Sequence, residues 1–161
     1  MKDMFIDLAK YRIQRAFENK GDAEILFRSE KITDSVNRIY QANFYAVKSL
    51  LATKMKDSAK HQLVLQIFQE NFILTGEVPK EYGQIVDRSY RCRDEGERHE
   101  KLQVTTREAQ SMIEDCEKFL GYVREYIKQF LIANPRRSSE VFDNDEEGQE
   151  RRGENKSRNK K

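Results

Sequence analysis

Residues 34–51 read DSVNRIYQANFYAVKSLL and combine apolar side chains with a crowded aromatic patch. The apolar positions recur every three to four residues, which is the period of an α-helix with one buried face. They are Val36, Ile39, Tyr40, Val47, Leu50 and Leu51, and Phe44 and Tyr45 complete the aromatic patch around Tyr40. We therefore predict a helix here and expect it to be the most buried element of the fold.

The neighbouring segments predict two more helices. Residues 3–29 show a loose helical spacing of apolar side chains, although Gly21 could break the helix because glycine costs about 1 kcal/mol relative to alanine. Short polar side chains bind the free N–H groups at the start of a helix. The expected caps are Thr33 or Asp34 for the second helix and Asp57 or Ser58 for the third.

Glycine, proline and threonine mark the later boundaries. Gly76 suits the left-handed position after the third helix, and Pro79 suits the first turn of a fourth. Thr105 and Glu108 have the spacing of a capping box, which predicts the start of a fifth helix. We expect that helix to end before the Asn-Pro pair at residues 134–135.

Five helices with short connections favour an all-α fold, an antiparallel up-and-down helical bundle. The chain has 7 glycines and 2 prolines, too few turn residues for an all-β sandwich or barrel. We expect the bundle in residues 1–134. Residues 135–161 form an acidic block followed by a basic one with few apolar side chains, so we expect a disordered tail.

The charge of the chain is high but balanced. Charged residues make up 36% of the sequence, yet the net charge is +2, so any RNA contact would have to be local. The N-terminus lacks the pattern of a signal peptide, and no stretch approaches the roughly 20 apolar residues of a membrane span. We therefore expect a cytoplasmic protein that does not enter a membrane.

The two cysteines, Cys92 and Cys116, lie on separate predicted helices. Their spacing fits neither a zinc site nor a disulfide scaffold. We expect buried, reduced thiols, and we expect neither a metal site nor a cofactor.

One face of the predicted fourth helix changes from apolar to charged along its length. Tyr82, Val86, Ser89, Arg93 and Glu97 follow one another at helical spacing. This phase turns Arg93 toward a core, a groove or an interface. A buried arginine needs a partner, and Glu97 one turn later could supply it as an internal salt bridge.

Arg93, Asp94, Glu97 and His99 lie where this helix runs out into a charged loop. Arginine is always cationic and matches phosphate in a fork, while histidine transfers protons near neutral pH. Arg93 and His99 are therefore the groups that metal-free cleavage of a phosphodiester needs, with Asp94 or Glu97 orienting the guanidinium. They could equally belong to a solvated run of charges.

Three other polar residues need an interpretation. His61 lies in the first turn of the third helix, where we expect it to pack or form a local hydrogen bond. Asn37 and Arg38 lie on a mostly apolar helix. They form either a buried polar network or part of the same cleft as Arg93.

Three stretches, taken in order, resemble the HEPN family (higher eukaryotes and prokaryotes nucleotide-binding domain), most closely its small prokaryotic branch. The stretches are YRIQRA with DAEIL in residues 11–26, DSVNRIYQA in residues 34–42, and Lys60-His61 followed by Phe68, Phe72, Thr75-Gly76 and Pro79. Arg93 falls where the arginine of that family's fourth helix falls.

The resemblance implies a compact helical bundle that is often a homodimer. Many members are metal-independent endoribonucleases in which four to six residues, commonly beginning with a polar one, separate an arginine from a histidine. Arg93, Asp94 and His99 fit this pattern, with five residues between Arg93 and His99. In prokaryotes such proteins are often encoded beside a small nucleotidyltransferase, and the pair acts as toxin and antitoxin.

The chain also departs from this pattern. Lys101 occupies the position of the tyrosine that is adenylylated in the toxin subgroup, so modification there is not supported. Glu97 and Arg98 stand where close relatives often have an acidic residue and a tyrosine, and Gln41 replaces the second aromatic of the signature helix.

Three functional hypotheses remain. The first is a toxin-like endoribonuclease in which a two-fold dimer brings together two copies of Arg93 and His99. The second is a non-catalytic module that dimerises and docks on a nucleotidyltransferase or another regulatory partner. The third is nucleotide binding, which Arg38 and Arg93 would permit, although the chain lacks a phosphate-binding glycine loop.

Overall fold

The computed structural model describes residues 2–98 and 104–136 of the chain. This part is helical and contains no strand, which confirms the predicted all-α bundle. Helix α3 runs directly into a π-helical turn, η1, before the chain reaches α4. The elements are α1 (Lys2–Arg28), α2 (Ile32–Thr53), α3 (His61–Phe68), η1 (Gln69–Ile73), α4 (Lys80–Arg98) and α5 (Thr106–Ala133).

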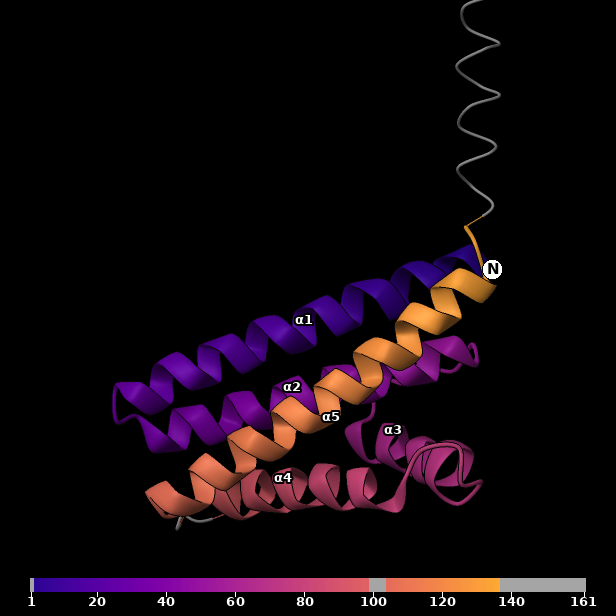
Figure 1. The fold of residues 1–161 in the computed structure, drawn as a ribbon. Coiled ribbons are helices and arrows are strands. Elements are labelled where there is room, and N and C mark those ends of the chain that lie inside the picture. The colour runs from indigo at the N-terminus through magenta and orange to yellow at the C-terminus, as the bar shows by residue number, and fades with distance from the viewer. Residues whose placement is uncertain (1, 99–103, 137–161) are drawn as a thin grey trace, which may run out of the picture.

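Helices α1 and α2 form a long antiparallel hairpin, and α5 crosses both of them (Figure 1). Helix α4 packs beside α2 and α5 on the side away from α1, and the short α3 leads into it (Figure 1). The end of α4 and the start of α5 lie at one end of the bundle. The N-terminus lies at the other end, where Arg136 pairs with Asp7 at 3.1 Å.

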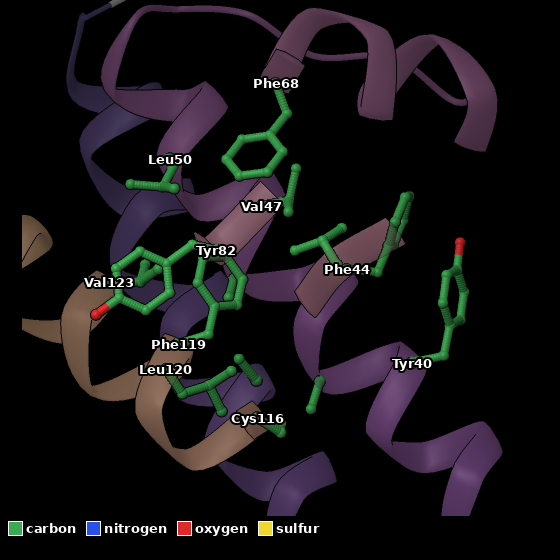
Figure 2. Packing of buried hydrophobic residues seen from close by; sticks show 14 of the residues in the cluster. Tyr40, Phe44, Val47, Leu50, Phe68, Tyr82, Cys116, Phe119, Leu120 and Val123 are labelled. Carbon is green, nitrogen blue, oxygen red and sulfur yellow. The ribbon is translucent and has the colours of Figure 1, made fainter. Parts of the chain in front are cut away.

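Helix α2 carries the centre of the core, as its apolar period predicts. Its apolar residues Val36, Ile39, Tyr40, Val47, Leu50 and Leu51 are each at most 1% exposed. Figure 2 shows α2 packed among aromatic and aliphatic side chains of the other helices. Among them are Phe68 of α3, Tyr82 of α4, and Phe119, Leu120 and Val123 of α5.

Most predicted boundaries are confirmed. Gly76 has the left-handed φ of +76° that was expected after the third helix. The break considered at Gly21 does not occur, and α1 is continuous from Lys2 to Arg28. The hydroxyl of Thr105 accepts a hydrogen bond from the backbone N–H of Glu108 at 3.1 Å, which caps α5. That helix ends at Ala133, before the Asn-Pro pair.

The two other cap predictions were wrong. Helix α2 begins at Ile32, before Thr33 and Asp34, and its N-cap Lys31 makes no side-chain cap. Helix α3 begins at His61, also without a side-chain cap. Asp57 instead forms a salt bridge with Arg12 at 2.9 Å, so a tertiary contact replaces the expected local one.

Candidate functional site

The buried stripe of α4 leads to Arg93. Tyr82, Val86 and Ser89 are 8%, 3% and 2% exposed, and Arg93 one turn later is half-buried. The amide of Asn43 on α2 donates a hydrogen bond to the Ser89 hydroxyl at 3.2 Å, which ties the two helices together just before Arg93. The predicted inward phase of Arg93 is therefore confirmed.

The Arg93 guanidinium lies over the aromatic ring of Tyr40 on α2. Its central carbon is 4.7 Å from the centre of that ring. This is a cation–π contact, which is stronger where water is partly excluded. An arginine guanidinium can contact an aromatic ring, and its N–H groups match the oxygens of a phosphate.

Tyr40 is also joined to His61, the first residue of α3. The Tyr40 hydroxyl lies 2.8 Å from Nδ1 of His61, and either atom can donate depending on the imidazole tautomer. The His61 ring stacks on Phe44 with ring centres 4.2 Å apart. The prediction that His61 packs or hydrogen-bonds is confirmed, but its partners come from α2 rather than from its own helix turn.

Tyr40, Phe44 and His61 were not predicted as neighbours of the site. Tyr40 and Phe44 project from the same side of α2, one helical turn apart (Figure 2). The one available signal was the hydroxyl of Tyr40, because a buried tyrosine usually needs a polar partner. Which residue would meet that need depends on how α3 docks, and the sequence pattern does not contain this information.

The other predicted site residues are placed less completely. His99 lies outside the described residues, one position beyond the end of α4 at Arg98. Asp94 and Glu97 lie within α4, but their side chains are outside the described part of the structure. The Arg93–Glu97 salt bridge therefore stays a prediction.

Asn37 and Arg38 are exposed, which excludes the buried polar network considered for them. Arg38 donates a hydrogen bond to the Asn19 side chain at 3.1 Å and lies 3.8 Å from the Asp22 carboxylate, so it points toward α1. Asn37 precedes Tyr40 by three positions and therefore shares its side of α2. The structure does not join Arg38 to Arg93, whereas Asn37 lies on the side of α2 that carries Tyr40.

A pocket of about 400 Å³ lies between α3 and α4, beside the aromatic group formed by Tyr40, Phe44 and His61. Tyr90 forms part of its wall and also lies 6.1 Å from Tyr40, measured between ring centres. Its other lining residues combine amide, carboxylate and apolar groups. They are Gln62, Leu65, Gln66, Phe68, Gln69, Gly83, Val86 and Asp87.

Both cysteines were predicted to be buried, and the prediction is confirmed for Cys116 only. Cys92 is half-buried and Cys116 is buried. Burial raises the pKa of Cys116 to about 12, so it remains a thiol at neutral pH. In the described ranges no group of three metal-ligating side chains comes together, and none of the helices there is long and apolar enough to cross a membrane.

Comparison with known proteins identifies the family. The model of the HEPN domain matches residues 9–126. A UPF0332 protein of Thermotoga maritima is 34% identical over 126 residues, which cover 78% of this chain and 96% of that protein. Two Methanocaldococcus jannaschii proteins named as candidate toxins are 34% and 30% identical, over 74% and 71% of this chain and 88% and 78% of their own lengths. The chain therefore belongs to the HEPN domain family.

Proposed function

We propose that this protein is a metal-independent endoribonuclease of the toxin–antitoxin type, with Arg93 and His99 as its catalytic residues. The observation that carries the proposal is the half-buried guanidinium of Arg93, held over Tyr40 near the end of α4 with His99 six positions later. The family and its relatives named as candidate toxins support a toxin-like role.

The proposed reaction is attack of a ribose 2′-oxygen on the adjacent phosphorus. A base takes the 2′-hydroxyl proton, the 5′-oxygen leaves with a proton from an acid, and a 2′,3′-cyclic phosphate remains. Arg93 would stabilise the charge that grows on the non-bridging oxygens. His99 would act as base or acid, a role that contributes typically 10²–10⁴-fold. Asp94 or Glu97 would orient the guanidinium.

The reaction needs two proton-transfer groups, which leads us to propose a homodimer. A two-fold axis near the end of α4 would bring two copies of Arg93 and His99 into one cleft. Such a cleft can recognise RNA through local contacts, which suits a chain with a net charge of +2. The pocket beside Tyr90 offers space for a nucleobase next to the phosphate. We expect the protein to act in the cytoplasm, where its substrate is found.

The test is cleavage of single-stranded RNA by the purified protein with a chelator present. We expect wild-type protein to yield 2′,3′-cyclic phosphate and 5′-hydroxyl ends, identified by mass spectrometry. His99→Ala should lower the rate by on the order of 10²–10⁴-fold, because it removes a proton-transfer group. Equal rates for wild type and His99→Ala would refute the role of His99.

A second candidate function is a non-catalytic module that dimerises and docks on a nucleotidyltransferase or another regulator. Lys101, in place of the tyrosine modified in related toxins, and the nearly neutral charge favour it. Co-expression with a nucleotidyltransferase encoded beside this protein tests this candidate. A stable complex together with absent RNA cleavage by the protein free of this partner would support the second function and exclude the first.

A further inference from the structure

We propose that Tyr40 and His61 are positioning residues for Arg93, and that His61 acts through the Tyr40 hydroxyl. The catalytic consequence rests on the proposed function, whereas the placement of Arg93 does not. Three helices contribute one residue each, Arg93 from α4, Tyr40 from α2 and His61 from α3. Their contacts form a continuous chain from the imidazole to the guanidinium.

The first link fixes the Tyr40 ring. Tyr40 is 1% exposed, so water cannot readily satisfy its hydroxyl. Nδ1 of His61 does so at 2.8 Å. Because the hydroxyl lies at the far end of the side chain, this bond restrains the tilt of the whole ring. Loss of this bond would remove a restraint on the far end of the ring and favour rearrangement of the ring.

The second link fixes His61 itself. Its ring stacks on Phe44 at an interplanar angle of 20°. Helix α3 has eight residues and is held to the bundle by Val64 and Phe68, which are 0% and 2% exposed. The position of His61 is therefore set by the packed core rather than by a mobile loop.

The third link passes the position of the Tyr40 ring to Arg93. The guanidinium carbon lies 4.7 Å from the ring centre, a distance at which a shift of the ring changes the cation–π attraction. A guanidinium placed before substrate arrives stabilises the transition state without reorganising, and small misplacements lower the rate steeply. We therefore expect His61 to affect kcat more than KM.

The placement is tested by NMR of the Arg93 Nε–Hε group in the full chain without RNA. The Tyr40 ring should shift this proton upfield. His61→Leu and Tyr40→Phe should both move the signal toward that of an exposed arginine. His61→Asn should preserve it, because the asparagine amide can replace Nδ1 as the partner of the hydroxyl. An unchanged Arg93 signal in folded His61→Leu would overturn the proposal.

The consequence is tested by a double-mutant cycle in the chelator-containing cleavage assay. We expect His61→Leu and Tyr40→Phe each to lower kcat by on the order of 10–100-fold, with little change in KM. The double variant should be no slower than either single one, because both remove the same bond. Leu63→Ala, at an α3 position that is 42% exposed and lies outside the pocket lining, is the matched control and should retain wild-type kcat.

The NMR experiment and the cleavage assay together distinguish failure of the positioning role from failure of the proposed function. Losses that multiply in the double variant, or a change confined to KM, would overturn the positioning role. If wild-type protein does not cleave RNA, the proposed function fails, while the Arg93 signal still decides whether His61 places the guanidinium. Thermal melting of each variant, followed by circular dichroism, shows whether a loss reflects unfolding, and His61→Asn then serves as the folded comparison.

Discussion

Arg12 and Arg93 are both drawn into the bundle, but by different partners. The Arg12 side chain is 8% exposed and donates hydrogen bonds to the Asp57 carboxylate at 2.9 Å and the Lys48 carbonyl at 3.2 Å. The Arg93 guanidinium instead contacts an aromatic ring, with its central carbon 4.7 Å from the centre of the Tyr40 ring. The first arrangement fixes a guanidinium through hydrogen bonds to oxygen atoms, and the second places one through its contact with an aromatic ring.

Asp57 is expected to link stability to acid pH. Burial opposes its ionisation, but the hydrogen bond from Arg12 and the charges of Arg12 and Lys48 outweigh burial and lower the pKa of Asp57. A lowered pKa in the folded state stabilises the protein above the ordinary carboxyl pKa of about 4, and this stabilisation is lost as pH falls through the folded-state value.

Asp57→Asn should therefore lower the free energy of unfolding at pH 7 by about 1–2 kcal/mol. This range already allows for solvent screening of a carboxylate that is 40% exposed. Urea unfolding at pH 7 and pH 3 measures the effect, and the difference from wild type should shrink at pH 3. Asp115→Asn, which removes a weaker pair with Arg88 at 3.8 Å, is the control and should have a smaller effect. An equal deficit at both pH values would contradict the account.

The inward position of Arg93 could be predicted because it depends only on helical phase. Val86 and Ser89 precede Arg93 at helical spacing on the same face of the helix, so this spacing alone was enough to predict its orientation. The bond between Tyr40 and His61 could not be predicted in this way. Its partners are 21 residues apart and meet only after α3 docks on α2. The role of His99 stays a prediction.

At the scale of elements, tertiary contacts override local preferences. Gly21 does not break α1, because the helix is held against α2 by packing on both sides of the glycine, at Ala16 and Ala23, which are fully buried. The helix starts were predicted less well than the helices themselves. Cap preference is a weak local signal, and Asp57 illustrates how a salt bridge with a distant helix displaces it.

Two glycines in this fold should respond in opposite directions to the same substitution. A Cβ at Gly21 would meet no atom within 4 Å, so Gly21→Ala should stabilise the protein by about 0.5–1 kcal/mol through helix propensity. Gly76 has a φ of +76°, which other residues adopt with strain. Gly76→Ala should therefore destabilise it by about 1–2 kcal/mol. Chemical denaturation of the two variants measures this difference, and changes of the same sign would contradict it.

At the scale of the whole molecule, the proposed site and the start of α1 lie at opposite ends of the bundle. Arg93 lies near the end of α4, at the end of the bundle where α5 begins, and the N-terminus lies at the opposite end (Figure 1). A dimer that pairs the ends of α4 would therefore leave the salt bridge between Asp7 and Arg136 outside its interface.

The proposed dimer predicts that activity depends on protein concentration. Specific RNA cleavage should fall as the protein is diluted below its dimer dissociation constant, because each cleft then loses half of its groups. Sedimentation velocity across the same concentrations gives the fraction of dimer. Constant specific activity through the range in which the protein becomes monomeric would rule out a shared site.

The comparison of Arg93→Ala with Arg91→Ala tests the central claim most directly. Both arginines lie on α4, but the Arg91 side chain is 66% exposed and pairs with Asp87 at 3.1 Å one turn earlier. With a chelator present, Arg93→Ala should lower kcat for RNA cleavage by about 10²–10³-fold, the loss expected when a group that stabilises transition-state charge is removed. Arg91→Ala should cleave at the wild-type rate. Equal rates for the two variants would contradict the assignment of Arg93 as the phosphate-binding residue.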